Sequence, residues 1–239
     1  MTAPVIFDRP LLRRRLRRRD DDVCRFVAEQ MAAEIRDRLA LIKRDFQSPL
    51  VAGPFAPWMA PLLDFTRPVV EGLNVEFDDE AFPFADGSLD CIVSIFSLQT
   101  VNDLPGSLAQ MRRALQPDGL LLAALFAGET LHELRSAWLA AESELTGGAT
   151  LRVAPMIGLR ELGGLLQRAG FALPVAGVFA AGRAFALPRD LAGWAAAGWG
   201  RASAAVSSSS HASFMQSVKN PGSGTMLRQD TADTHITPL

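Results

Sequence analysis

The sequence predicts an α/β protein built on a mainly parallel sheet with helices on both faces. Two observations lead to this fold class. Apolar segments of strand length alternate with amphipathic segments of helix length along residues 49–179, and strands that alternate with helices in this way form parallel sheets. The segment Leu89 to Phe96 is almost continuously apolar, as expected of a strand buried on both faces of such a sheet.

The N-terminal region, residues 1–48, combines a basic segment with a helix. Residues 9–19 hold seven arginines, and three aspartates follow at 20–22. The arginine run could contact phosphates, an anionic lipid surface or an acidic partner, or it could be the solvated face of a helix. The aspartates can cap the next helix. Apolar residues at three- and four-residue steps predict that this helix extends to about Phe46: Val23, Val27, Met31, Ile35, Leu39 and Ile42.

Residues 49–185 carry the alternation of strands and helices. The first strand is a short apolar run that Gly53 and Pro54 end. Turns are expected at Asp86-Gly87 and at 116–119. The periodicity predicts further strands at 73–77, 89–96, 120–126 and 171–179, and helices at 104–115, 130–145 and 157–169. Gly170 closes the last of these helices, as a left-handed cap would.

Residues 186–239 are expected to hold a C-terminal helical segment and a flexible tail. Beyond residue 200 the periodic signal fades into serine-rich and polar sequence, including Ser207–Ser210 and the end of the chain at 231–239. Such composition does not support a packed core.

Composition and charge exclude several classes of protein. The 239 residues are 49% hydrophobic with a formal net charge of −2, so the chain can bury a core and is no nucleic-acid binder by overall charge. No apolar stretch reaches the roughly 18 residues of a membrane span. No apolar segment follows the first arginines as in a secretory signal, and we expect a cytoplasmic protein. Cys24 and Cys91 form no CxxC pair, and no metal site is expected.

Four motifs stand in order in the middle of the chain: Phe77–Phe84, Ser88–Ser94, Val101–Pro105 and Leu115–Gly119. Together they resemble the class I S-adenosylmethionine-dependent methyltransferases. Further matches are similar to bacterial homologues of a mitochondrial complex I assembly factor, and less so to biotin-synthesis carrier-protein methyltransferases: Ile6–Arg9, Gly128–Arg135, Arg152–Pro155 and Leu162–Phe171. The resemblance implies a Rossmann-like sheet with S-adenosylmethionine across the carboxyl ends of its strands.

The first loop of this family normally has the pattern Asp-x-Gly-x-Gly-x-Gly, whose glycines let the backbone approach the ligand. Here Val51 takes the place of the aspartate, Gly53 is retained, and Phe55 and Pro57 replace the next two glycines. A phenylalanine ring would enter the space of the amino-acid moiety, and proline supplies no N–H donor. Gly53 is a candidate cofactor residue, or it is simply the end of a strand.

The resemblance also implies polar contacts to the cofactor. The acid that matches Asp78 contacts adenine in the family, so Asp78 and its neighbour Asp79 are candidates, although an aspartate here could equally cap a turn. Asp64 is the candidate for the acid that binds the ribose hydroxyls after the second strand. Gln99 and Thr100 replace the family's His-Trp pair. Gln99 can still form a hydrogen bond, while the stacking surface of Trp is lost.

The distance between Gly53 and Asp78 along the chain is too short for the usual arrangement. Only 24 residues lie between them. Two crossovers of at least about 10–12 residues each and two strands of about five residues each need on the order of 30 or more. The sequence therefore predicts a truncated first crossover and a second strand that is missing or rudimentary.

Two functions follow from the resemblance. One is an S-adenosylmethionine-dependent methyltransferase, or a related protein-modifying enzyme such as an arginine hydroxylase, with His132 or Arg152 as further residues that could face the pocket. His132 could instead lie on an exposed helix face. The alternative is a catalytically inactive binding or assembly protein, whose partner contacts the arginine-rich N-terminus or the apolar segment 195–199. Neither the acceptor nor a catalytic residue is evident in the sequence.

Overall fold

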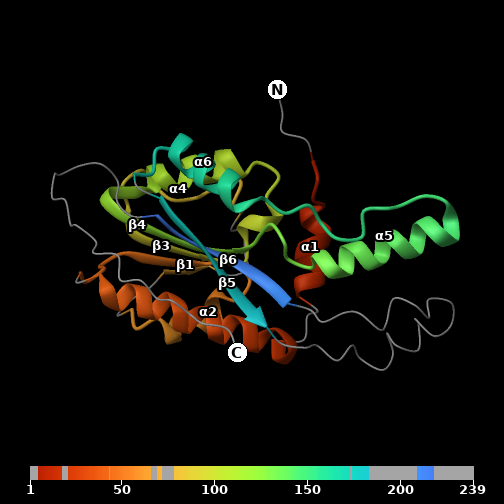
Figure 1. The fold of residues 1–239 in the computed structure, drawn as a ribbon. Coiled ribbons are helices and arrows are strands. Elements are labelled where there is room, and N and C mark those ends of the chain that lie inside the picture. The colour runs from red at the N-terminus through yellow and green to blue at the C-terminus, as the bar shows by residue number, and fades with distance from the viewer. Residues whose placement is uncertain are drawn as a thin grey trace.

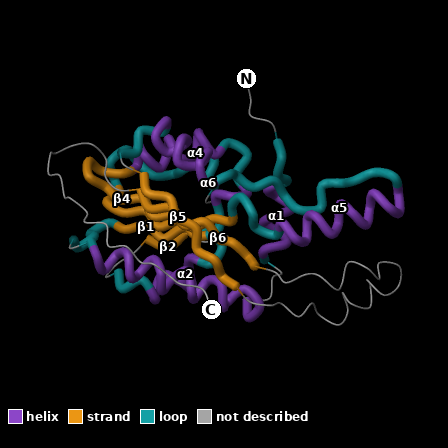
Figure 2. Tube along the Cα trace, in the orientation of Figure 1, coloured by secondary structure: helices purple, strands orange, loops and turns teal. Residues whose placement is uncertain are grey.

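The computed structural model describes residues 5–17, 21–42, 44–65, 69–71, 78–172, 174–182 and 209–217. These residues form a layered α/β fold in which helices cover both faces of one sheet (Figure 1, Figure 2). The strands of the sheet lie in the order β2-β1-β3-β4-β6-β5. The predicted α/β class, with a mainly parallel sheet and helices on both faces, is confirmed.

Four strands form the parallel part of the sheet: β1 (Pro49–Ala52), β2 (Val69–Glu71), β3 (Leu89–Ile95) and β4 (Leu115–Phe126). β1 pairs in parallel with both β2 and β3, and β3 pairs in parallel with β4. Every residue of β3 is buried, which confirms the strand that its continuous apolar run predicts. Because parallel strands end at one edge, the carboxyl ends of β1 and β3 lie side by side.

Two further strands complete the sheet, and one of them corrects the sequence analysis. β5 (Pro174–Gly182) was expected, but β6 (Ser209–Ser217) lies where the sequence predicts a flexible tail. β6 pairs antiparallel with both β4 and β5, so its backbone hydrogen-bonding groups are used on both sides. That pairing is not encoded in the polar composition of the segment. The remaining parts of the predicted C-terminal region, 186–208 and 218–239, lie outside the described residues.

Helices pack on the two faces of the sheet. α2 (Asp21–Leu41) covers one face, and α4 (Leu104–Ala114) and α6 (Leu159–Arg168) cover the other (Figure 1). Met31 and Ile35 of the stripe predicted on α2 are fully buried. Strand side chains alternate between faces, so β3 supplies both core clusters: Cys91, Val93 and Ile95 pack on the α2 side, and Ile92 on the other.

The first crossover is short, as the sequence predicts. Sixteen residues, 53–68, join β1 to β2. Their described part, 53–65, holds only the four-residue helix α3 (Ala56–Met59) and the 3-10 helix η1 (Ala60–Leu62). β2 itself has three residues. The truncated crossover and the rudimentary second strand are both confirmed. The strand predicted at Leu73–Phe77 lies outside the described residues.

The turn predicted at residues 116–119 is a bulge inside β4. Leu89 of β3 pairs with Leu115, but Cys91, two residues on, pairs with Leu120. The intervening residues of β4 therefore bulge out of the ladder, and Asp118 has a left-handed φ of 65°. The Pro-Asp-Gly sequence favours this local distortion without ending the strand.

Candidate functional site

A cavity of about 250 Å³ lies at the carboxyl edge of β1 and β3. α1 (Arg9–Leu16) covers it, and α1 also lies beyond the strand ends in Figure 1, beside the start of α5 (His132–Thr146). Crevices at the carboxyl ends of strands are where α/β sheets bind ligands. The residues that line the cavity come from α1, the first loop and the segment after β3, with Asp79 and Phe126 besides: Arg9, Leu12, Arg13, Leu16, Gly53, Pro54, Phe55, Asp79, Phe96, Ser97, Gln99, Thr100 and Phe126.

Gly53 is required by the close approach of two strands. Its φ is +123°, and a Cβ atom built on it would lie 2.1 Å from the carbonyl oxygen of Ile95. L-residues rarely adopt this backbone conformation, and a side chain would collide with the main chain of β3. Glycine is therefore needed at position 53 for a structural reason, and it lies at the wall of the cavity.

The rest of the loop offers few hydrogen-bond donors. Pro54 and Pro57 have no N–H group, and the N–H of Ala56 donates to the carbonyl oxygen of Gly53 at 3.0 Å. Phe55 lines the cavity, with its ring edge-on to Phe96 at a centroid distance of 6.1 Å. The ring of Phe96 in turn stacks on Phe126 at 4.6 Å. One wall of the cavity is therefore aromatic, and its loop lacks the amide cradle of a glycine-rich sequence.

Asp78 and Asp79 meet the arginines of α1. Arg9 Nη2 lies 2.9 Å from Asp78 Oδ1 and 3.5 Å from Asp79 Oδ2, and Arg13 Nη2 lies 3.1 Å from Asp78 Oδ2. The hydroxyl of Ser97 donates to Asp79 Oδ1 at 3.1 Å. The arginine run is thus neither wholly solvated nor bound only to an external partner, because two of its side chains pair with the acids of the site.

The two carboxyl groups have opposite pKa shifts. Burial raises the pKa of Asp79 above its ordinary value of 3.8, in spite of the Arg9 charge and the Ser97 hydrogen bond. Burial also acts to raise the pKa of Asp78, but the N–H of Glu80 and the guanidinium groups of Arg9 and Arg13 together hold it below 3.8. Relative to a free aspartate, the surroundings thus shift the pKa of Asp79 upward and the pKa of Asp78 downward.

These shifts predict opposite effects of pH on stability. Asp79 stabilises the fold more below pH 3.8 than above it, so the wild type should lose free energy of unfolding relative to Asp79→Asn as pH rises above 3.8 through the raised pKa. Asp78 contributes stability above pH 3.8 that is lost as pH falls through its lowered pKa, so the difference between the wild type and Asp78→Asn should shrink with acidification. Urea titrations across pH 3–7 measure both, and slopes of the same sign for the two variants would contradict this assignment.

Gln99 has one polar atom without a partner. Its side-chain Nε2 donates to the carbonyl oxygen of Phe96 at 2.9 Å, while its buried Oε1 accepts no hydrogen bond. The buried Nε of Arg9, on the same cavity, also lacks a partner. Buried polar atoms are normally satisfied, so a ligand that supplies both a donor and an acceptor would complete the hydrogen bonding of this cavity.

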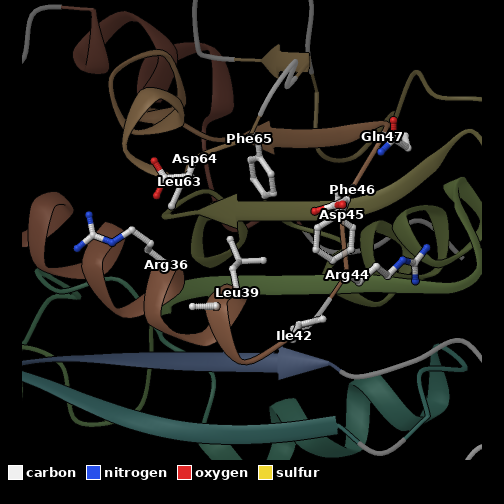
Figure 3. Close-up of a pocket in the computed structure, with 11 residues that line it drawn as sticks. Arg36, Leu39, Ile42, Arg44, Asp45, Phe46, Gln47, Leu63, Asp64 and Phe65 are labelled. Carbon is white, nitrogen blue, oxygen red and sulfur yellow. The ribbon is translucent and has the colours of Figure 1, made fainter.

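Asp64 does not join the other candidates, which corrects the sequence analysis. It lines a separate cavity of about 900 Å³ with Leu63 and Phe65, beside Arg36 and Leu39 of α2 (Figure 3). The reason is the position of β2. Asp64 precedes this strand instead of following it, so it cannot lie at the carboxyl end where the expected acid belongs.

The residue at the carboxyl end of β2 is Glu71, which the sequence analysis does not single out. Glu71 is the last residue of β2 and pairs with Ala52, the residue before Gly53. A strand of three residues is too short to show a periodicity. The residue at its carboxyl end therefore could not be identified from the sequence. Arg9 and Arg13 were also missed as site residues, since a run of seven arginines does not indicate which of them fold back onto the sheet.

His132 and Arg152 do not line this cavity. His132 is the first residue of α5, and its Nδ1 lies 3.1 Å from the carbonyl oxygen of Glu129. Arg152 Nε donates to Glu142 Oε1 at 2.6 Å, and its guanidinium lies over the ring of Trp138. Arg152 therefore holds the segment after α5 against that helix.

Among the described residues, no three His, Cys, Asp or Glu side chains gather as a metal site. In the same part of the chain, no helix is both long and apolar enough to span a bilayer. Cys91 is buried in β3, and burial raises the pKa of its thiol, as for a small core residue.

Comparisons with known proteins agree with the fold. A family model described as a methyltransferase domain matches residues 61–123. The mouse protein named arginine-hydroxylase NDUFAF5, mitochondrial, is 35% identical over 189 residues, which cover 70% of this chain and 55% of that protein. The malonyl-[acyl-carrier protein] O-methyltransferase of Laribacter hongkongensis is 42% identical over 98 residues, or 41% of this chain and 31% of that protein. The chain thus spans about half the length of the first relative, and less of the second.

A solved structure supports the α/β fold and nothing beyond the fold. A methyltransferase candidate from Bacillus halodurans C-125 superposes with a TM-score of 0.52 at 16% identity, over 80% of this chain and 99% of that one. The two proteins therefore share the sheet with helices on both faces. The residues that line the cavity are described for this chain alone.

Proposed function

Because the chain belongs to the family of class I S-adenosylmethionine-dependent methyltransferases, we propose that it is a methyltransferase, or a related protein-modifying enzyme, that binds S-adenosylmethionine at the carboxyl edge of β1 and β3. The observation that carries this proposal is the cavity on which Gly53, Asp79 and Gln99 converge, with Asp78 beside it. A protein side chain is the proposed acceptor, in keeping with the relative named as an arginine hydroxylase.

The nucleoside part of the cofactor fits these residues. The aromatic wall of Phe55, Phe96 and Phe126 offers apolar surface to a purine ring. Asp78 and the unpartnered Oε1 of Gln99 are acceptors for an exocyclic amine. The volume of about 250 Å³ lies below the roughly 300–1,000 Å³ of small-molecule sites, so a bound cofactor is expected to extend beyond the cavity or to displace part of α1.

When bound, the cofactor supplies a methyl group already activated on a sulfonium. The protein then needs to exclude water and to align an acceptor, and few side chains have to take part. Arg9, Leu12 and Leu16 of α1 line the cavity on the side of this helix. The acceptor is proposed to enter beside this helix.

Calorimetric titration with S-adenosylmethionine tests the proposal, with adenosine and inosine as a matched pair. Micromolar binding of the cofactor is expected. Adenosine should bind more tightly than inosine, because inosine carries a carbonyl where the acceptors Asp78 and Gln99 need an amine. Folded protein that shows no heat at millimolar cofactor would contradict the proposal.

Glu71 is proposed to bind the ribose hydroxyls, in the place first expected for Asp64. Glu71→Gln should weaken S-adenosylmethionine binding roughly tenfold or more, since hydrogen bonds to a charged group contribute about 1.5–3 kcal/mol. Asp64→Asn is the control, and asparagine tolerates the left-handed φ of 56° at this position. Calorimetry measures the affinity of each variant for S-adenosylmethionine. A larger loss of affinity in Asp64→Asn than in Glu71→Gln would contradict the role proposed for Glu71.

A second candidate function is a catalytically inactive binding or assembly protein. The observation that favours it is the pairing of Asp78 with both Arg9 and Arg13, together with the donor-poor loop at 53–57. In that case α1 closes the cavity permanently, and neither S-adenosylmethionine nor adenosine raises the melting temperature as a ligand of the native state would.

A further inference from the structure

Both carboxylate oxygens of Asp78 are occupied by arginines of α1. Arg9 Nη2 lies 2.9 Å from Oδ1, which also accepts the N–H of Glu80 at 3.1 Å. Arg13 Nη2 lies 3.1 Å from Oδ2. Arg9 and Arg13 line the cavity, while Asp78 does not. The two guanidinium groups therefore separate the carboxylate from the cavity, and an amine inside the cavity can reach Asp78 only if they move.

α1 is held in this position mainly by polar contacts. None of its eight residues, all of which are described, is buried. Arg9 Nη1 donates to the carbonyl oxygen of Thr100 at 3.1 Å. Ahead of the helix, Asn102 Oδ1 accepts the N–H groups of Ile6 and Phe7 at 2.7 and 2.8 Å, and Asn102 Nδ2 donates to the carbonyl oxygen of Phe7 at 3.2 Å. A helix without a buried residue depends on such contacts for its place.

The closed position of α1 is only weakly favoured over an open one. The Nε–H of Arg9 is buried, and no described residue accepts from it; a buried donor without an acceptor is unfavourable. The side chain of Asp78 is 32% exposed, and ion pairs that water reaches contribute little to stability. A helix as short as α1 is also marginal in isolation. Local opening of this element is therefore expected to cost little free energy.

We propose that α1 is an autoinhibitory helix: its arginines occupy Asp78 in the unliganded protein, and adenine displaces them when the cofactor binds. This inference rests on the proposed binding of S-adenosylmethionine and names the regulation of that site. The exocyclic amine of adenine and the guanidinium groups compete for one carboxylate. Departure of α1 also enlarges a cavity of about 250 Å³, which is small for a small-molecule site. The measured affinity is then the intrinsic affinity multiplied by the fraction of molecules in which α1 is open.

Asn102→Ala tests the proposal, because it weakens the hold on α1 without altering the cavity. Asn102 does not line the cavity, and its backbone hydrogen bond to Glu80 is kept. The calorimetric affinity for adenosine, which carries no charge, should rise roughly fivefold or more, since the lost hydrogen bonds stabilise only the closed position. Arg13→Met should act in the same direction by uncovering Oδ2 of Asp78. Arg14→Met is the control and should change the affinity by no more than about twofold, because Arg14 is exposed on the same helix and does not line the cavity.

Hydrogen exchange of the backbone amides of α1 measures the opening directly. Saturating adenosine should speed exchange at residues 9–16, because the helix leaves the edge of the sheet when the ligand takes its place. A helix that closes over its ligand would instead exchange more slowly in the complex. Slower exchange with adenosine would therefore overturn the proposal.

The affinities also separate this inference from the proposed function. If the folded wild type binds adenosine and Asn102→Ala binds it no more tightly, α1 is a fixed wall of the site; the inference is then overturned and the proposed function stands. If neither protein binds adenosine or S-adenosylmethionine at millimolar concentration, both are overturned. Thermal melts establish that each protein compared is folded, and Arg13→Met takes the place of Asn102→Ala in the comparison if the latter does not fold.

Discussion

Gly53→Ala is expected to lower the free energy of unfolding by at least about 3 kcal/mol, the upper end of the cost of a strained backbone conformation. The φ of +123° is one cause, and the Cβ position 2.1 Å from the carbonyl oxygen of Ile95 is the second. To relieve the contact, the carboxyl ends of β1 and β3 must separate. The cavity lies between these ends, so binding of S-adenosylmethionine should fall with stability.

Two other glycines are matched controls for Gly53→Ala. At Gly148 an added Cβ would meet no atom within 4 Å, and the φ is not positive, so Gly148→Ala should change stability by no more than about 0.5 kcal/mol. Gly87 has equal space but a φ of +66°, and Gly87→Ala should cost about 1–2 kcal/mol. Urea denaturation of the three variants measures the order. Equal stability of Gly53→Ala and Gly148→Ala would contradict the close approach of the strands.

Leu108→Ala is expected to destabilise the protein by about 2–5 kcal/mol, as for other fully buried leucines. Leu108 lies on α4 and is completely buried between this helix, the sheet and α6, in the cluster that also contains Met111, Leu121 and Leu166. Its removal takes apolar atoms out of the core and leaves a cavity that the neighbouring strands cannot close.

Leu139→Ala provides the comparison for Leu108→Ala. Leu139 lies on α5 and is 53% exposed, and alanine is a good helix former at both positions. Its substitution should change stability by no more than about 0.5 kcal/mol. Similar midpoints of chemical denaturation for the two variants would show that α4 does not pack on the sheet as described.

The cavity has the location that is usual for its fold, but its lining residues differ from those of a glycine-rich cofactor loop. The cavity lies where ligands bind in α/β folds, but its first loop is donor-poor and its acids pair with α1. Fold alone does not establish activity, and of two relatives to which the chain is similar, one is named a hydroxylase and the other a methyltransferase. Binding measurements with S-adenosylmethionine, adenosine and inosine therefore distinguish the two functions, which the fold does not.

Much of the fold was predictable because burial is periodic along the chain. The continuous apolar run of β3 and the stripe with Met31 and Ile35 on α2 identify a strand and a helix from local sequence. The truncated crossover was predictable from chain length alone, since helices and strands have fixed rise per residue. β6 was not predictable, because its polar residues are held by backbone pairing with β4 and β5.

The candidate site was only partly predictable. Gly53, Asp78, Asp79 and Gln99 gather at one edge of the sheet, as the motifs indicate, with Asp78 beside the cavity that the other three line. Asp64 does not gather with them, because it precedes β2 and lines a separate cavity, and the limits of that short strand cannot be located from the sequence.

The sequence by itself determined the alternation of strands and helices ahead of β6, the shortened first crossover and the N–H donors that the prolines of the first loop lack, since each depends on residues near one another in the chain. Only the tertiary structure decided which acids meet which arginines. Arg9 and Asp78 are 69 positions apart, and a charge has no periodicity that reveals its partner. Their contact exists because the sheet edge and the anchored helix α1 bring them together.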